Sequence, residues 1–192
     1  MNEFLFYIKQ GIQHISDFAG FDHMLFIIVL SSNYTFKNWK KVVVLVTAFT
    51  IGHSATLALT SLGLLQVNFR LIEFIIPITI LITSVYQLSI GRNEKTMWIP
   101  YTFALMFGLI HGMGFSNFFQ SMTMGIDDEI LFPLFSFNVG IEIGQLAIVL
   151  VTLITQLIVI SIFKFIKQKQ WYVALNLLGT CLSIYLISKI AL

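Results

Sequence analysis

Six long apolar runs, separated by short polar stretches, dominate this chain and restrict what it can fold into. They cover residues 11–30, 41–64, 69–90, 98–119, 130–166 and 171–192. Each reaches the ~20 residues that an α-helix needs to cross the hydrocarbon core of a bilayer. Hydrophobic residues make up 57% of the 192 residues, which is more than one soluble core of this size can bury. We therefore expect an all-α, polytopic membrane protein, a bundle of about six transmembrane helices.

The remaining composition excludes several other classes of protein. No polar linker is long enough to bound a second domain, so we expect a single transmembrane domain over residues 1–192. The net charge of +2 is too small and too scattered to indicate a nucleic-acid partner. The single cysteine, Cys181, excludes an internal disulfide and a cysteine-rich metal site. The first run has no preceding basic region and no small-residue cleavage site, which favours a retained helix over a signal peptide.

Basic residues fall mainly in alternate connections between the runs. The first, third and fifth connections hold eight of them, and the opposite side holds three: Lys37, Lys40, Lys41, Arg92, Lys95, Lys164, Lys167 and Lys169 against Lys9, Arg70 and Lys189. The fourth connection is acidic, with Asp127, Asp128 and Glu129. Because short cytoplasmic loops are enriched in lysine and arginine, the odd-numbered connections are predicted to be cytoplasmic. Both termini would then lie outside.

All four histidines lie inside apolar runs, although histidine is disfavoured in hydrocarbon. At 1.5 Å per residue, His53 and His111 each lie about 18–20 Å from the cytoplasmic ends of their helices. By the same rise, Asn138 lies about 12 Å and Glu142 about 18 Å below the outer surface. Polar groups from several helices thus share the central and outer part of the bilayer. This agreement in depth predicts one shared site that opens outward.

The residue types at this depth indicate a metal site. Imidazoles combined with carboxylates, without thiolates, suit borderline divalent ions such as nickel, cobalt or zinc. The expected ligands are His14, Asp22, His23, His53, His111 and Glu142. The residues expected to hold these ligands in orientation, or to line the site, are Ser54, Glu73, Asn138 and Gln145.

Several of these residues also have simpler explanations. Asp22 and His23 are compatible with a buried ion pair, and Ser54 with a hydrogen bond to its own helix. His14 lies nine residues before His23, about half a turn out of phase on an ideal helix. Either the chain breaks near Gly20, or His14 faces elsewhere.

Two glycine pairs, Gly108 with Gly112 and Gly140 with Gly144, have the four-residue spacing of close helix–helix contacts. The spacing does not decide whether such contacts form within one chain or between chains. A homo-oligomer formed through these faces is therefore an open possibility.

Five segments resemble the HupE/UreJ family of bacterial membrane proteins: residues 11–26, 49–57, 73–77, 107–116 and 138–145. Members are usually described as nickel, or nickel and cobalt, permeases that serve hydrogenase and urease maturation. The resemblance implies a bacterial inner-membrane location and a metal motif that contains His14, Asp22 and His23. It also implies that His53, His111 and Glu142 belong to the later motifs. The first histidine and the aspartate are eight residues apart here and six in the commoner pattern, which indicates a divergent branch.

Three functional hypotheses follow from these observations. The first is a metal permease in which histidines and carboxylates bind the ion transiently. The second is an intramembrane zinc-dependent, hydrolase-like enzyme in which Glu73, Glu142 or Asp22 acts as the base. The third is a metal-stabilised assembly factor without turnover. Few polar residues follow on the cytoplasmic side of His53 and His111, which counts against simple transport.

The predicted orientation can be tested by cysteine labelling in intact cells. A cysteine placed at Asn38 should be protected from a membrane-impermeant thiol reagent, and one placed at Asp127 should react, because positive charge retains the odd-numbered connections inside. The reverse labelling pattern would contradict the orientation and the outward access of the site.

Overall fold

The computed structural model describes residues 2–18, 20–91, 98–123 and 130–191, and all regular structure in these ranges is helical. The elements are α1 (Glu3–Ile15), α2 (Asp22–Ser31), the short 3-10 helix η1 (Phe36–Asn38), α3 (Trp39–Ser61), α4 (Phe69–Ile90), α5 (Trp98–Met122), α6 (Leu131–Ile162) and α7 (Gln168–Ala191). Among the described residues, five helices, α3 to α7, are long and apolar enough to cross a membrane. The predicted all-α, multi-pass membrane class is confirmed.

Local signals in the sequence explain where the long helices begin and end. Helix α4 begins after Asn68, whose side-chain oxygen accepts a hydrogen bond from the Leu71 N–H at 3.2 Å. It ends at Gly91, which adopts a φ of 68° that most other residues disfavour. The observed helix coincides with the apolar run predicted over residues 69–90.

The first apolar run does not form one continuous helix. Helix α1 ends at Ile15 and α2 begins at Asp22, so the chain breaks close to Gly20, which was one of the two alternatives. The Ser16 hydroxyl donates a hydrogen bond to the Ile12 carbonyl at 2.6 Å. The Ser16 N–H donates to the same carbonyl at 3.2 Å, so backbone and side chain of Ser16 together cap the last turn of α1. Two short helices therefore replace the first spanning helix.

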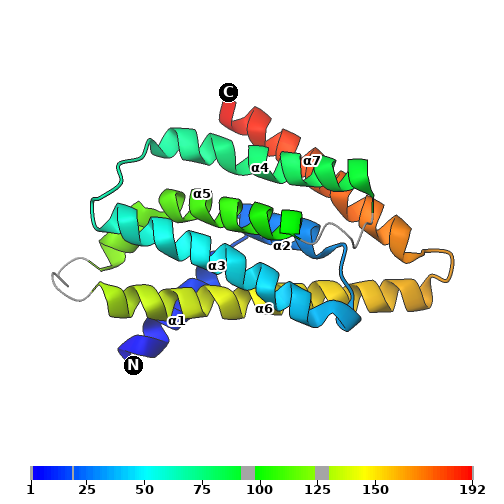
Figure 1. Ribbon diagram of the computed structural model, residues 1–192, viewed down its shortest axis with the longest axis horizontal. Helices are drawn as coiled ribbons and strands as arrows, with labels where there is room; N and C mark the ends of the chain where they lie inside the picture. The colour runs from blue at the N-terminus through cyan, green and yellow to red at the C-terminus, as the bar shows by residue number, and fades with distance from the viewer. Residues whose placement is uncertain (1, 19, 92–97, 124–129, 192) are drawn as a thin grey trace.

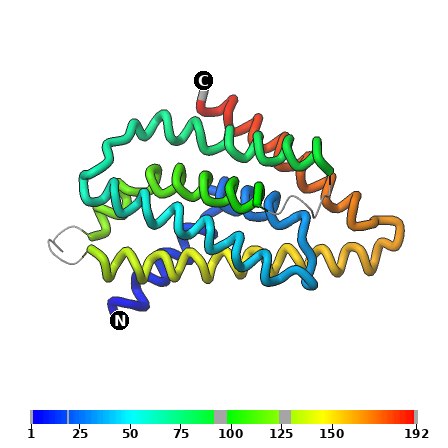
Figure 2. The backbone as a smooth tube through the Cα atoms, viewed as in Figure 1, coloured from blue at the N-terminus to red at the C-terminus, as the bar shows by residue number. Residues whose placement is uncertain are grey.

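The helices pack in pairs, of which α4 and α7 run antiparallel, whereas α3 and α5 run in the same direction (Figures 1 and 2). Helix α3 packs along α5, α1 along α6, and α4 along α7, while α2 contacts α4, α6 and α7. Figure 1 shows that α3 and α5 end near the beginning of α6 and the N-terminus, at one end of the bundle. At the other end, α2 leads into α3, and α6 leads into α7.

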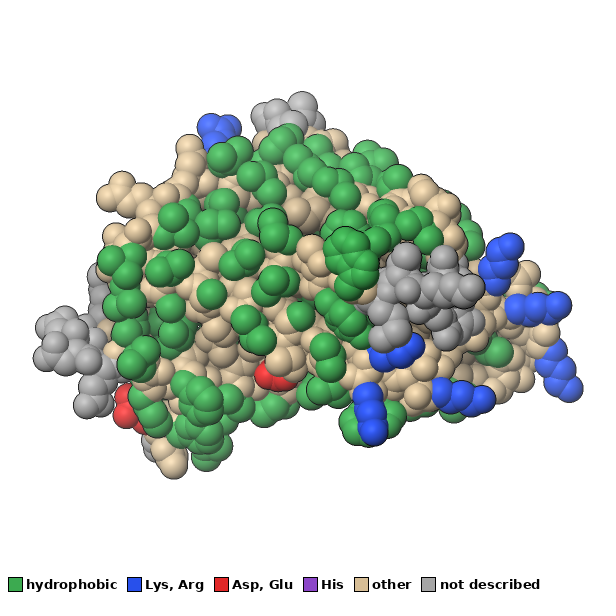
Figure 3. All heavy atoms as spheres, viewed as in Figure 1, with side chains coloured by type: hydrophobic (Ala, Val, Ile, Leu, Met, Phe, Trp, Pro, Cys, Tyr) green, Lys and Arg blue, Asp and Glu red, His purple; other side chains and the backbone are tan. Residues whose placement is uncertain are grey.

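Lysines gather at the end of the bundle where α6 meets α7, which we call the lysine end (Figure 3). The described members of this group are Lys37, Lys40, Lys41, Lys164, Lys167 and Lys169. Five other charged residues on which the predicted orientation depends lie outside the described residues: Arg92, Lys95, Asp127, Asp128 and Glu129. The described lysines thus lie together in space, as expected for alternate connections.

Glycines let the helix backbones approach closely within this chain. A Cβ atom added to Gly108 on α5 would lie 2.2 Å from the Phe49 carbonyl oxygen on α3. One added to Gly140 on α6 would lie 2.2 Å from the Ile8 carbonyl oxygen on α1. Both glycine pairs singled out in the sequence therefore contribute to packing inside the chain, and a homo-oligomer stays a prediction.

Replacing Gly108 by alanine should destabilise the protein, because the new methyl group would overlap a backbone carbonyl that cannot move independently. We expect a cost of about 1–3 kcal/mol or more, as for other overpacked positions. Gly114→Ala is the matched control, since its added Cβ would meet only side-chain atoms, of Ile72 at 3.3 Å and Ile76 at 3.6 Å. Thermal unfolding in detergent should show a lower melting temperature for Gly108→Ala alone. Equal melting temperatures would contradict the packing.

Candidate metal centre

The break in the first run brings two helix ends together inside the bundle. His14 lies in the last turn of α1, and Asp22 and His23 lie in the first turn of α2. The ring centroids of His14 and His23 are 4.7 Å apart. The half-turn mismatch expected on a continuous helix does not arise, because the chain changes direction between the two histidines.

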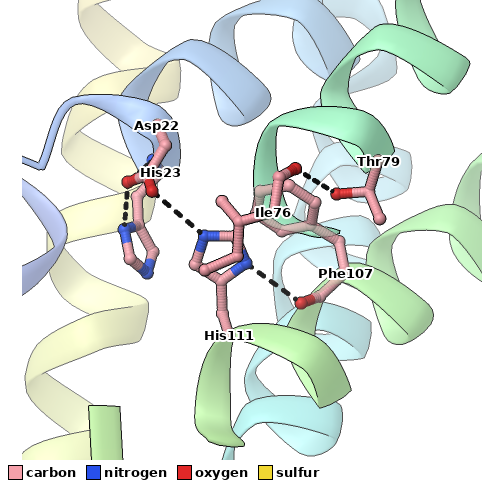
Figure 4. A network of polar contacts seen from close by, with 6 residues as sticks. All are labelled: Asp22, His23, Ile76, Thr79, Phe107 and His111. Atoms are coloured by element: carbon pink, nitrogen blue, oxygen red, sulfur yellow. Dashed lines mark hydrogen bonds and ion pairs between the residues drawn. The ribbon is translucent and has the colours of Figure 1, made fainter. Parts of the chain in front are cut away.

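Asp22, His23 and His111 form the tightest group of candidate ligands in the described part of the chain. One ligand atom from each residue lies within 4.8 Å of the others. Asp22 Oδ1 lies 2.9 Å from His23 Nδ1, and Asp22 Oδ2 lies 3.8 Å from His111 Nε2. Figure 4 shows the carboxylate between the two imidazole rings. His111 is almost completely buried and His23 is 7% exposed.

His53 on α3 lies beside this group and is fully buried. Its ring centroid is 5.9 Å from that of His14. Its Nδ1 atom lies 3.3 Å from Asn138 Oδ1 on α6. The Asn138 amide nitrogen donates to the Leu134 carbonyl at 2.8 Å, which directs the amide oxygen toward His53. His53 Nδ1 is therefore the nitrogen that carries hydrogen.

The other imidazoles in the group are oriented in the same manner. His23 Nδ1 lies 2.9 Å from Asp22 Oδ1, and His111 Nδ1 lies 3.2 Å from the Phe107 carbonyl oxygen. Because both partners are acceptors, each Nδ1 donates and each Nε2 retains its lone pair. Nε2 is buried and has no hydrogen-bond partner in any of the four histidines, His14, His23, His53 and His111.

This arrangement fits a divalent transition metal. Buried acceptors without partners are destabilising, and a cation that accepts their lone pairs removes that cost. Metal-binding histidines usually donate the second ring N–H to a carboxylate, carbonyl or amide, as His23, His111 and His53 do. The donor set of imidazoles and one carboxylate suits nickel, cobalt or zinc.

Aromatic rings enclose the centre and limit its contact with water. Phe26 and Phe107 stack at a centroid distance of 3.5 Å, and Phe107 also stacks on His111 at 3.9 Å. On the other side, Phe115 lies 3.7 Å from the His14 ring. These phenylalanines could not be predicted from the sequence, since an apolar helix gives no signal for which ring will cover a polar site.

Glu142 and Gln145 lie along the contact between α3 and α6. Thr47 Oγ1 donates to Glu142 Oε1 at 2.7 Å, and Thr50 Oγ1 donates to Gln145 Oε1 at 3.1 Å. Both residues therefore have threonine partners on α3, and their expected roles at the metal site stay predictions.

Ser54 and Glu73 were also expected to line the site. The Ser54 hydroxyl donates to the Thr50 carbonyl of its own helix at 2.7 Å, which matches the simpler explanation. Glu73 is exposed on α4. Of the residues expected to orient the ligands, Asn138 is the one with a hydrogen bond to a histidine ring.

The fold and the site together define a multi-pass membrane protein with a buried cluster of histidines and an aspartate. The chain matches the family model described as HupE / UreJ protein over residues 1–189, nearly its whole length, and it belongs to this family. The resemblance noted in the sequence is thereby confirmed. Comparisons with curated proteins and with solved structures find no match.

Single substitutions should separate the ligands from the residues that orient them. His23→Ala, His53→Ala and His111→Ala should each remove most bound metal, because each deletes an Nε2 donor. Asn138→Ala should weaken the affinity by ~10–100-fold without abolishing binding, since it only frees the His53 ring. Elemental analysis and titration of the purified variants measure both effects. Full metal content in all three histidine variants would contradict a shared centre.

Proposed function

We propose that the protein is a permease for a divalent transition-metal ion of the nickel and cobalt type. The observation that carries this proposal is the buried group of Asp22, His23 and His111, with the rings of His14 and His53 beside it. The family to which the chain belongs is associated with nickel and cobalt transport. In this function the ion is the substrate, and the histidines and Asp22 bind it during its passage.

A permease must exchange ions with both sides of the membrane, and polar groups between the centre and the lysine end support this requirement. The hydrogen-bonded pairs Thr50–Gln145 and Thr47–Glu142 follow His53 along the contact between α3 and α6. Closer to the lysine end, a cavity of about 580 Å³ is lined by Gln156, Gln168 and Lys37, among others. These groups supply oxygen atoms that were not evident when α3 was considered alone.

Carboxylates also lower the free energy of a divalent ion inside the membrane. A divalent ion loses its hydration in the membrane, and anionic ligands compensate for part of that loss. Asp22 lies at the centre, and Glu142 lies on the α3–α6 contact toward the lysine end. We propose that Glu142 is a later ligand on the path, and that Glu73 on the exposed face of α4 acts near the outer surface.

We place the protein in the bacterial inner membrane, with the lysine end in the cytoplasm and both termini outside. The cluster of described lysines at one end of the bundle supports this orientation (Figure 3). The histidine centre would then receive its ions from the outer side.

A second function, an intramembrane zinc-dependent enzyme, is favoured by one observation. Three imidazoles are held by fixed Nδ1 partners, an arrangement common where a metal remains bound. In such an enzyme the metal would activate a water molecule, with Asp22, Glu73 or Glu142 as the base. A metal-dependent assembly role without turnover would use the same centre.

Uptake of nickel or cobalt into proteoliposomes tests the proposal. The wild-type protein should show saturable uptake, and His111→Ala should lower it to the background of empty liposomes, because the variant lacks a central donor. Thr155→Val is a suitable control, since Thr155 is exposed on α6 and bonds only to its own helix. It should transport like the wild type.

The absence of uptake by a fully metallated wild-type protein would contradict the permease and favour the enzyme. Glu142→Gln then becomes informative. A metal ligand replaced in this way should lose metal and activity together, whereas a general base should lose turnover with the metal retained.

A further inference from the structure

A cavity of about 590 Å³ adjoins the histidine centre from the end opposite the lysines. Its polar lining includes Gln10, Gln13 and Asp17, and its aromatic lining includes Phe115 and Phe118. Phe118 lies four residues before the end of α5, so the cavity reaches the outer part of the helix bundle. The proposed function assigns no role to this cavity.

His14 is the histidine that belongs to both the cavity and the centre. Its side chain lines the cavity, and its Nε2 atom is buried without a hydrogen-bond partner. Its ring centroid lies 4.7 Å from that of His23 and 5.9 Å from that of His53. It is not a member of the tight group formed by Asp22, His23 and His111. His14 thus lies between the cavity and the enclosed ligands.

Phe115 packs against His14 at the edge of the cavity. It belongs to the cavity lining, and its ring centroid lies 3.7 Å from that of His14. It also stacks on the fully buried Phe137 at 5.1 Å. The Phe115–His14 contact therefore lies where the cavity adjoins the histidine centre.

The electrostatic surroundings favour a cation along this route. The Asp17 carboxylate belongs to the cavity lining, and the side chains of Gln10 and Gln13 add amide oxygens. Helix α1 ends at Ile15, directly beside His14, and the C-terminal end of a helix carries partial negative charge. A negatively charged concave surface also raises the local concentration of cations.

We propose that this cavity is the outer access port for the metal ion and that His14 is its transfer ligand. A hydrated divalent cation collects beside Asp17, exchanges a water molecule for His14 Nε2, and then passes to His23 and the enclosed centre. Phe115 is the gate, since its ring covers His14. This proposal rests on one part of the proposed function, namely that a metal ion binds at the histidine centre.

The rate of Co²⁺ binding to the purified metal-free protein tests the transfer role, with stopped-flow absorbance as the readout. His14→Ala should slow binding about tenfold or more while the equilibrium affinity of the centre falls far less. Asp17→Asn should lower the association rate on the order of tenfold, with a weaker dependence on salt. Glu3→Gln, an exposed carboxylate at the start of the same helix, is the control and should bind at the wild-type rate.

The gate is tested in the same assay. Phe115→Leu should speed Co²⁺ binding and release together, because the ring no longer covers His14. Phe135→Leu, on the exposed face of α6, should leave both rates unchanged. Equal rates for Phe115→Leu and the wild type would overturn the gate.

Blocking the cavity tests the route directly. In a Cys181→Ser background, a cysteine at the exposed Gln13 should, once modified with a bulky thiol reagent, prevent Co²⁺ from reaching the centre. The same modification at Lys164→Cys, an exposed position at the lysine end, should have no effect on this step. Blockage from position 164 alone, or from neither position, would overturn the port.

These experiments distinguish the access-port proposal from the permease proposal. Loss of equilibrium affinity in His14→Ala as severe as in His111→Ala would make His14 an ordinary ligand and overturn its transfer role. Co²⁺ binding that depends on His14 and Gln13, in a protein that transports no metal, would support the port and contradict the permease.

Discussion

The absence of water from the hydrocarbon core is the constraint on which the structure depends. Every polar atom placed there must find a partner within the protein or in a bound ion. The Nδ1 atoms of His23, His53 and His111 meet this requirement through Asp22, Asn138 and the Phe107 carbonyl. Their Nε2 atoms have no hydrogen-bond partner, although His111 Nε2 lies 3.8 Å from the Asp22 carboxylate. The chemistry of the site depends on these Nε2 atoms, because a divalent cation can accept their lone pairs.

The break between α1 and α2 and the metal centre depend on each other. Irregular backbone inside a membrane persists only where its polar groups are paired or face a cavity. Here Ser16 bonds to the Ile12 carbonyl, and Asp22 accepts from the His23 N–H at 2.8 Å. Transporters often place binding sites at such discontinuous helices, because helix ends supply partial charges. The break that costs helical hydrogen bonds is thus the feature that brings His14, Asp22 and His23 together.

Close backbone contacts bring the remaining ligands into place. Glycines allow α3 to approach α5, and α1 to approach α6, at distances that a side chain would prevent. The α3–α5 pair carries His53 and His111, and the α1–α6 pair carries His14 and Asn138. Small residues at helix contacts are a usual route to association in lipid, where the hydrophobic effect between helices is weak. The packing therefore serves the site as well as the fold.

The sequence by itself determined the membrane class and the approximate extents of the long helices, because hydropathy and helical rise are local properties. It also indicated the ligand types and allowed for a break near Gly20. Only the tertiary structure decided that His14 faces His23, that Asn138 orients His53, and that Thr47 and Thr50 bind Glu142 and Gln145. These contacts depend on how each helix is rotated and where the chain turns, which packing between distant segments sets.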